Sequence, residues 1–296
     1  MSRHDDPGQL VRAAGHDRVL LAGLRSAASG KDGAETVRRE LDRAIFVSGF
    51  VDEDEAGTYL AGVDRALETL TGLIGSGHAA GAAELAQHAL RLMHESAESV
   101  SYECELEECA GFAQELHRQA CLAADVDRRA LADWLFDAAA SDDYGLFQGA
   151  VTDYAQVLGE PGMARLRELI DAAMAAGGRY PLLQMAEQAA RPLGVDDVVD
   201  VLATDLQAAR QYTRICEELI SAGRDQQALG RARRGLKERG SERDHGLGQL
   251  RVITISLCSR LGNTTEAAGL AWEEFAAAPS LEACKRLCEH ATAEGT

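Results

Sequence analysis

A helix-turn-helix phrase that occurs twice is the feature that most limits how this chain can fold. It reads AGRDQQALGRARRGL from Ala222 and LGNTTEAAGLAWEEF from Leu261, a spacing of 39 residues, and a looser version begins at Gly77. The matching small residues are Gly223 and Gly262, Ala228 and Ala267, Gly230 and Gly269, and Ala232 and Ala271. Periods near this length are typical of solenoids built from paired helices. The chain is therefore predicted to be a helical repeat protein, a class that generally binds other molecules.

The small residues of the phrase have an expected physical purpose. Glycine supplies the backbone freedom that a tight turn between helices needs, and alanine lets two antiparallel helices approach closely. We expect the glycines and alanines of the phrase to serve turns and packing. Specificity should then lie in the variable positions, where a basic helix follows Ala222 and the acidic pair Glu273 and Glu274 follows Leu261.

Composition and periodicity favour helices throughout. Aromatic residues are only 5% of the chain, and the β-prone run at residues 252–255 is flanked by helical patterns. These features predict an all-α fold, a right-handed α-solenoid of antiparallel helix pairs, TPR-like or HEAT-like, with about fourteen helices. The expected parts are an N-terminal helix or cap with a loop at 1–33, irregular helical repeats at 34–194, and continuous TPR-like repeats at 195–296.

Several local signals refine this prediction. The acidic residues 52–55 are expected to open a long helix by complementing its dipole, and the helix should close at Gly75 and Gly77. A break is expected at residues 159–162, which read Gly-Glu-Pro-Gly. Trp134 and Trp272 both lie in apolar helical patterns, which predicts that both are core residues.

The charge balance limits the class of partner. The formal net charge of −18 argues against general binding to nucleic acid or anionic lipid, because phosphate contacts need clustered Lys and Arg. Residues 206–243 are the exception, with nine basic and five acidic side chains. No apolar run is long enough to cross a membrane, and the first residues lack the apolar core of a signal peptide, so a cytoplasmic protein without membrane contact is expected.

The sequence offers no convincing catalytic or metal-binding constellation. Cys104, Cys109, His117 and Cys121 could be assembled into a zinc site, but their spacing is poor and buried, reduced thiols are the favoured interpretation. No nucleophile elbow, phosphate-binding loop or dinucleotide-binding glycine pattern is present. We therefore expect no catalytic residues, no metal and no cofactor, and a protein that is not an enzyme.

The densest basic cluster lies on the second helix of the clearest repeat and the loop after it. It contains Arg231, Arg233, Arg234, Lys237, Arg239 and Arg243. One interpretation is a solvated helix face, since basic residues favour helix C-termini. The other is a docking surface for an acidic peptide or a nucleic-acid backbone, although aromatic residues for base stacking are absent. The candidate groove residues are Tyr212, Arg224, Arg231, Arg233, Arg234 and Lys237.

Three segments carry a resemblance to a known family. They are DRAIFVSGFVDEDEAGTYLAGVDRALETL, ALADWLFDAAASDDYGLFQGAVTDYAQVLGEPGMARLRELI and EEFAAAPSLEACKRLCEHA. Together, over residues 34–291, they resemble the helical region that follows the zinc finger in bacterial SWIM-type zinc finger proteins. The resemblance implies an all-α, TPR-like architecture. The CxC and CxH pairs of a SWIM finger are missing, so zinc or nucleic-acid binding by a finger is not implied, and the chain is either a fragment of a larger protein or a stand-alone form of the helical module.

The leading functional hypothesis is a non-enzymatic helical-repeat scaffold that binds a protein or peptide, of acidic character if the basic cluster is the docking surface. One alternative is an accessory subunit of a nucleic-acid-associated system, by analogy with the zinc finger proteins, although direct nucleic-acid binding is disfavoured. The other is a small-molecule-binding or enzymatic domain whose site forms between distant repeats.

Overall fold

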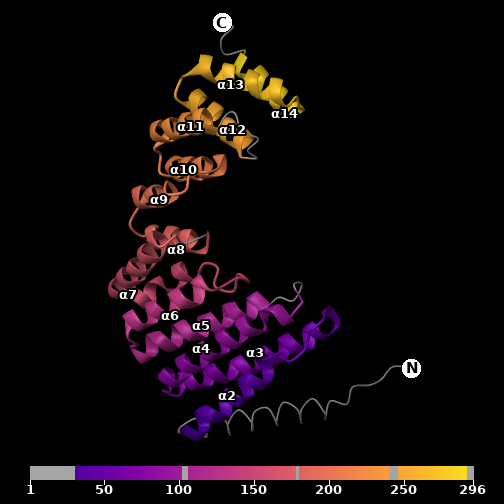
Figure 1. Ribbon diagram of the computed structural model, residues 1–296, viewed down its shortest axis with the longest axis vertical. Coiled ribbons are helices and arrows are strands. Elements are labelled where there is room, and N and C mark those ends of the chain that lie inside the picture. The colour runs from indigo at the N-terminus through magenta and orange to yellow at the C-terminus, as the bar shows by residue number, and fades with distance from the viewer. Residues whose placement is uncertain (1–30, 102–105, 178–179, 240–245, 292–296) are drawn as a thin grey trace, which may run out of the picture. The chain divides into compact units, whose positions relative to one another are not determined.

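A computed structural model describes residues 31–101, 106–177, 180–239 and 246–291 (Figure 1). Over these ranges the protein is all-α, with 13 α-helices that pack on their neighbours in a solenoid-like arrangement, which confirms the predicted fold class. An isolated bridge between Val51 and Val100 is the one β-type contact in the described part. The helix and loop predicted for 1–33 lie outside the described residues, except that residues 31–33 form the first turn of a helix instead of a loop.

The chain divides into two compact units between Gly177 and Gly178. The N-terminal unit contains α2 (Lys31–Ile45), α3 (Glu53–Gly75), α4 (Ala79–Ser96), a short 3-10 turn (Ala97–Ser99), α5 (Leu106–Ala124), α6 (Arg128–Ala140) and α7 (Ala150–Ala175). The C-terminal unit contains α8 (Tyr180–Ala190), α9 (Val195–Leu202), α10 (Ala209–Ser221), α11 (Asp225–Arg239), α12 (Leu247–Arg260), α13 (Thr264–Ala277) and α14 (Leu281–Ala291). The boundary expected after residue 194 falls inside the second unit.

The N-terminal unit follows its sequence signals closely. The acidic stretch begins α3, where the Asp52 carboxylate accepts a hydrogen bond from the Glu55 amide at 3.1 Å. Alanines 82, 86 and 89 of α4 are fully buried, which allows the close packing of α4 on α5. The break predicted at residues 159–162 is a kink at Gly159 within α7.

The repeated phrase forms the same turn each time. Gly223 and Gly262 have φ angles of 71° and 77°, and Gly77 of the looser version has 84°. In each case the following amide donates to a carbonyl five residues back: Arg224 to Leu219 at 2.8 Å, Asn263 to Cys258 at 2.8 Å, and His78 to Leu73 at 3.0 Å. This is the Schellman helix ending, which favours glycine because its backbone must turn left-handed. The turn role of these glycines is confirmed.

The other small residues of the phrase divide into two groups. The four matching alanines at 228, 232, 267 and 271 are fully buried, as the packing argument predicts. Gly230 and Gly269 are exposed, and a methyl group added to either would meet nothing within 4 Å. The expected packing role is therefore wrong for these two glycines, because their face of the helix points to solvent. The tightly packed glycine of α11 is Gly235, which lies against the Tyr212 ring.

Ion pairs connect α8 and the residue that follows it to α10 in the C-terminal unit. Glu187 of α8 is only 6% exposed and accepts hydrogen bonds from Arg214 of α10 and from Arg191, the latter at 2.7 Å. Arg191 also reaches Glu218 of α10 at 3.0 Å. The buried carboxylate is thus compensated by two guanidinium groups, which is the condition under which a buried charge is tolerated.

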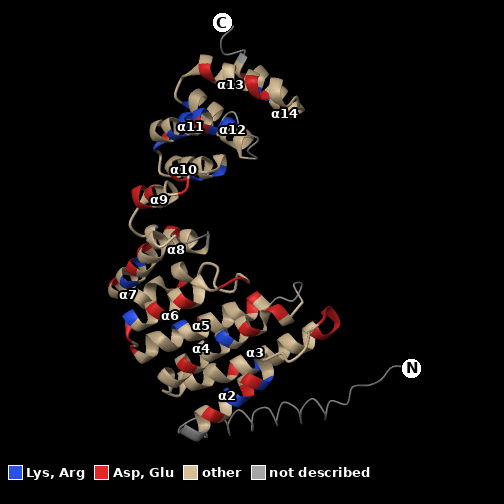
Figure 2. Ribbon diagram, viewed as in Figure 1, with Lys and Arg blue, Asp and Glu red and all other residues tan. Residues whose placement is uncertain are grey.

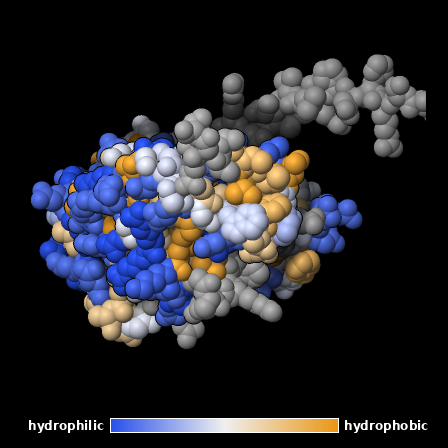
Figure 3. Space-filling view, turned by 90° about the horizontal axis from the view of Figure 1, so that it is seen from above, coloured by the Kyte–Doolittle hydropathy of each residue, from blue (hydrophilic) through white to orange (hydrophobic). Residues whose placement is uncertain are grey.

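The two tryptophans differ from the sequence prediction. Trp134 of α6 is half-buried, and Trp272 of α13 is 59% exposed, so the core assignment of Trp272 is wrong. Trp272 corresponds to Arg233 in the previous repeat, a position that faces outward, and its ring contacts Phe275 at a centroid distance of 6.3 Å. Leu281 of α14 is also exposed, and apolar surface appears as orange areas among hydrophilic ones in Figure 3.

Candidate functional site

The six residues predicted to line a groove all lie in the C-terminal unit, but they do not form one surface. Tyr212 is on α10, Arg224 precedes α11, and the other four are on α11. Lys and Arg residues are concentrated on α10, α11 and α12, whereas acidic residues predominate in the N-terminal unit (Figure 2). The basic residues thus lie on adjacent helices of one unit. Whether their charge is free to bind another molecule depends on whether carboxylates of this protein already pair with them.

Tyr212 belongs to the core and is removed from the candidate surface. Its side chain is 0% exposed, and its ring occupies the space that Gly235 leaves open. The hydroxyl donates to the carboxylate of Glu238 one turn beyond Gly235. Burial, together with this hydrogen bond, raises the pKa of Tyr212. The helical pattern alone did not reveal this position, since a tyrosine can bury its ring while its hydroxyl reaches a surface carboxylate.

Three of the predicted arginines are neutralised by carboxylates. Arg224 pairs with Asp196 of α9. Arg233 holds Glu266 of α13 through two hydrogen bonds, the Nε contact being 2.8 Å, and this contact lowers the pKa of the Glu266 carboxyl. Arg234 pairs with Glu238 on its own helix at 2.8 Å. The first two contacts join this region to α9 and α13, and the third lies within α11. This part of the basic cluster is therefore structural and offers little free charge to a partner.

Arg231 is the predicted residue that faces an open groove. It is half-buried and forms no hydrogen bond or ion pair with any residue that the structure describes. It lines a pocket of about 380 Å³ between α9, α10 and α11. The lining residues are Asp196, Val199, Asp200, Leu219, Gln227, Gly230 and Arg231. Lys237 is exposed on the same helix but does not line this pocket.

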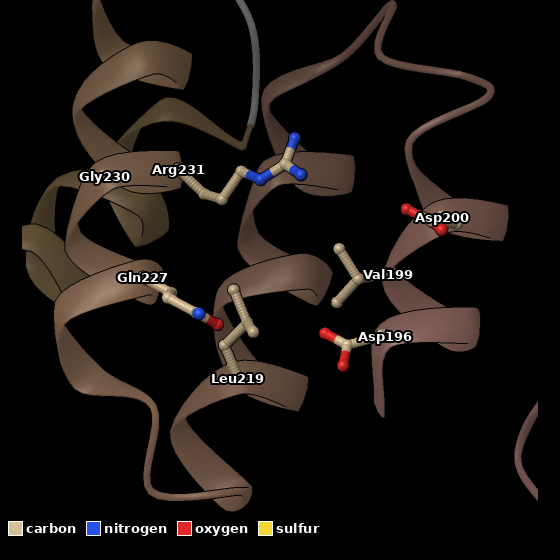
Figure 4. Close-up of a pocket in the computed structure, with 7 residues that line it drawn as sticks. All are labelled: Asp196, Val199, Asp200, Leu219, Gln227, Gly230 and Arg231. Carbon is tan, nitrogen blue, oxygen red and sulfur yellow. The ribbon is translucent and has the colours of Figure 1, made fainter. Parts of the chain in front are cut away.

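Side chains from α9 and α11 face one another across this groove (Figure 4). Arg231 and Gln227 extend from α11, Asp200 lies on the α9 side, and Val199 and Leu219 provide an apolar surface between them. The two apolar side chains are almost fully buried, whereas Asp200 is exposed. The groove thus combines an apolar floor with one cation, Arg231, on the α11 wall and two carboxylates, Asp200 and the Arg224-paired Asp196, on the α9 wall. This is the composition expected of a site that orients a polar partner.

The α9 wall was missed by sequence reasoning, although a signal for it exists. Asp196, Val199 and Asp200 lie at helical spacings of three and four residues, which places them on one face of α9. The segment VDDVVDVL reads as an ordinary short amphipathic helix. Only the packing of α9 beside α10 shows that this face borders Arg231.

The cysteines and histidine considered for zinc are distributed between two separate contacts. Cys109 donates to the Asp64 carboxylate at 3.3 Å, while Cys121 lies 3.2 Å from His117. Cys104 lies outside the described residues. Among the described residues, no group of three or more His, Cys, Asp or Glu side chains is arranged to hold a metal ion.

His117 and Cys121 belong to a buried chain of hydrogen bonds in the N-terminal unit. His117 Nδ1 lies 2.8 Å from the Tyr154 hydroxyl, which in turn is 3.4 Å from the Gln114 carbonyl. Since the tyrosine donates to the carbonyl, its oxygen accepts from the imidazole, and the Cys121 thiol donates to Nε2. Burial lowers the pKa of His117 to about 3 and raises the pKa of Cys121 to about 12. The imidazole of His117 and the thiol of Cys121 are therefore both uncharged near pH 7. The site lacks the thiolate that a cysteine nucleophile requires.

Taken together, these features define an all-α protein of neighbour-packed helices with a mixed-charge groove in its C-terminal unit. The chain belongs to a family of unknown function, DUF6880, whose match covers residues 11–191. This match spans the N-terminal unit from residue 11 and extends through α8, and its description names neither a SWIM finger nor a tetratricopeptide repeat. No curated protein matches the chain. None of the described helices combines the length and apolar character needed to cross a membrane.

Proposed function

We propose that this protein is a non-enzymatic, cytoplasmic scaffold that binds a protein segment in the groove between α9, α10 and α11. The observation that carries the proposal is Arg231, a half-buried guanidinium beside an apolar floor that has no partner among the described residues. An arginine in this setting can form two parallel hydrogen bonds with a carboxylate. The partner segment should therefore present an acidic side chain to Arg231.

The opposite wall adds a second requirement. Asp200 forms no hydrogen bond or ion pair within the described part of the chain, and it faces the groove from α9. A partner with acidic residues alone would meet repulsion there. A segment with an acidic and a basic residue separated by an apolar one would complement both walls and the floor, and the charge order would fix its direction.

Reversal of the Arg231 charge is expected to abolish this interaction. Wild type, Arg231→Glu and Lys237→Glu would each be used to capture partners from a lysate of the source cells, with quantitative mass spectrometry. Lys237→Glu makes the same charge change on the same helix outside the groove. We expect a partner retained by wild type and by Lys237→Glu whose affinity for Arg231→Glu is at least about tenfold lower, equivalent to about 1.4 kcal/mol. Equal binding to all three proteins would refute the groove assignment.

The role of nucleic-acid accessory subunit is a second proposal, supported by the resemblance to SWIM-type proteins and by the basic side chains of α10 to α12. It ranks second because Arg224, Arg233 and Arg234 are already paired with carboxylates. Binding to phosphate would weaken steeply with added salt. A gel-shift experiment with single- and double-stranded oligonucleotides at low salt tests it, and absence of retention would remove this role.

A further inference from the structure

A second pocket, in the N-terminal unit, has an aromatic wall and an unpaired carboxylate. It has a volume of about 220 Å³ and lies between α4 and α6. The lining residues are Gln87, Leu90, Arg91 and His94 of α4, Trp134, Asp137 and Ala138 of α6, and Ser141 and Phe147 from the segment before α7. This Trp134 pocket lies wholly within the part of the chain that matches the family.

The aromatic wall is fixed in place by its neighbours. The Trp134 ring lies 4.5 Å from the His117 ring and 6.0 Å from the rings of both Phe147 and Tyr154, measured between centroids. Because Trp134 is only half-buried, part of its ring remains available to the pocket. Edge and tilted ring contacts of this kind stabilise a defined orientation. A ligand would therefore meet a tryptophan whose position is already set.

The segment before α7 is also held in a defined conformation. The Asp142 carboxylate accepts hydrogen bonds from the backbone amides of Tyr144 at 3.2 Å and Phe147 at 2.6 Å. On the other side, His94 Nε2 lies 3.0 Å from the Ser141 carbonyl, so this nitrogen carries the proton and donates. The pocket is thus organised before any ligand arrives, which reduces the entropy lost on binding.

The charges at the rim favour a cation. Asp137 is exposed and forms no ion pair or hydrogen bond through its carboxylate within the described residues. Arg91 is occupied, since its Nη2 lies 2.8 Å from His88 Nδ1 and its Nε lies 3.9 Å from the Glu95 carboxylate. His88 in turn contacts the Asp42 carboxylate at 2.6 Å. The positive charge of Arg91 is therefore partly offset by the Glu95 carboxylate, whereas the negative charge of Asp137 has no such partner among the described residues.

The charge of the whole N-terminal unit acts in the same direction. Residues 1–177 contain 15 Lys and Arg against 31 Asp and Glu, whereas residues 178–296 contain 15 against 17. Nearly all of the net negative charge thus belongs to the first unit, where the ribbon of Figure 2 is red at many positions. A potential of this sign raises the local concentration of cations and the rate at which they associate.

We propose that the Trp134 pocket binds an arginine side chain from a basic segment of a partner protein. The planar guanidinium would stack on the Trp134 ring and pair with the Asp137 carboxylate, and the Gln87 amide could accept a further hydrogen bond. This site is independent of the α9–α11 groove, which requires an acidic residue in its partner. A failure of either proposal leaves the other intact.

Fluorescence of Trp134 tests the proposal directly. The chain contains two tryptophans, so a Trp272→Phe background, which changes an exposed ring, leaves Trp134 as the only one. In this background we expect an acetylated, amidated hexa-arginine peptide at low ionic strength to change the Trp134 emission in a saturable manner. A hexa-glutamate peptide should have no effect. Unchanged emission throughout the hexa-arginine titration would overturn the proposal.

Two variants distinguish the pocket from general attraction to an acidic surface. Asp137→Asn is expected to weaken hexa-arginine binding about fivefold, and Gln87→Glu, which adds a carboxylate at the rim, to strengthen it by a similar factor. Asp171→Asn on α7 removes the same charge from an exposed position that does not line the pocket, and should change the affinity less than about twofold. Equal losses in Asp137→Asn and Asp171→Asn would show attraction to the surface only and would overturn the proposal.

Discussion

Lowering the pH from 7 to 4.5 is expected to reduce the folding free energy of the N-terminal unit by about 2–3 kcal/mol through His117 alone. The imidazole is fully buried, and desolvation holds its pKa at about 3 in the folded protein, below its ordinary value of 6.5. Between these two values the unfolded chain binds a proton that the folded chain does not. Stability from this group is therefore complete above pH 6.5 and is lost as the pH falls toward 3.

Urea unfolding followed by Trp134 fluorescence measures this loss, because the Trp134 ring lies 4.5 Å from the His117 ring. The measurement uses the Trp272→Phe background, so that the signal reports the N-terminal unit. In His117→Gln the loss of stability between pH 7 and 4.5 should be smaller by about 2–3 kcal/mol, since the group that takes up the proton is gone. His78→Gln is the control for removal of a histidine elsewhere in the same unit. An identical pH dependence in wild type and His117→Gln would contradict the argument.

Replacement of Gly235 by alanine is expected to destabilise the C-terminal unit by about 2 kcal/mol. The added methyl group would lie 2.6 Å from Tyr212 Cγ and 2.8 Å from Leu250 Cδ2, closer than such atoms can approach. The ring cannot move aside easily, because its hydroxyl is bonded to Glu238 and the surrounding core is closed. The better helix propensity of alanine, about 1 kcal/mol, offsets only part of this cost.

Gly230→Ala is the matched control on the same helix and should have the opposite sign. Its methyl group would meet nothing within 4 Å, so only the gain in helix propensity remains, about 0.5–1 kcal/mol of stabilisation. Circular dichroism during urea unfolding gives the stability of each variant, and hydrogen exchange of peptides from α10 to α12 locates the change. A Gly235→Ala protein as stable as Gly230→Ala would show that the Tyr212 contact is not tight.

The turn and contact positions of the repeat could be predicted because they depend on local rules. A glycine before a left-handed turn and an alanine between close helices are required wherever two helices reverse direction, so Gly223 and Ala228 were assigned correctly. Gly230 and Gly269 look the same in sequence, yet they face solvent. A small residue in the sequence shows that a small side chain is tolerated at that position. It does not show whether a neighbouring residue lies so close that a larger side chain would clash.

The candidate site depended on pairings that a single sequence does not show. In the sequence, Arg231, Arg233 and Arg234 are three arginines of one basic cluster, and nothing distinguishes them. The difference in charge between the repeats, basic after Ala222 and acidic after Leu261, was expected to determine specificity. In the structure Arg233 of α11 pairs with Glu266 of α13, and Glu274 of α13 pairs with Arg286 of α14, so part of that contrast joins helices within the unit. Arg231 differs because it forms no ion pair among the described residues: Asp196 of α9 is paired with Arg224, and Asp200 lies across the groove. The partner of a charged side chain is a tertiary property, and it decides which arginine stays available.

The buried carboxylate of Glu187 limits how proteins of this design can gain or lose helices in evolution. The family match ends just after α8, and the Glu187 side chain on that helix is compensated by Arg214 from α10. A descendant that kept α9 and α10 but lost the arginine at position 214 would keep only Arg191 as a partner for the buried carboxylate, at a cost that selection would act on. The described helices after α10 contribute no ion-pair partner to Glu187. We therefore expect relatives to vary freely in length after α10, and those that keep α9 and α10 without an arginine at the position of Arg214 to have replaced Glu187.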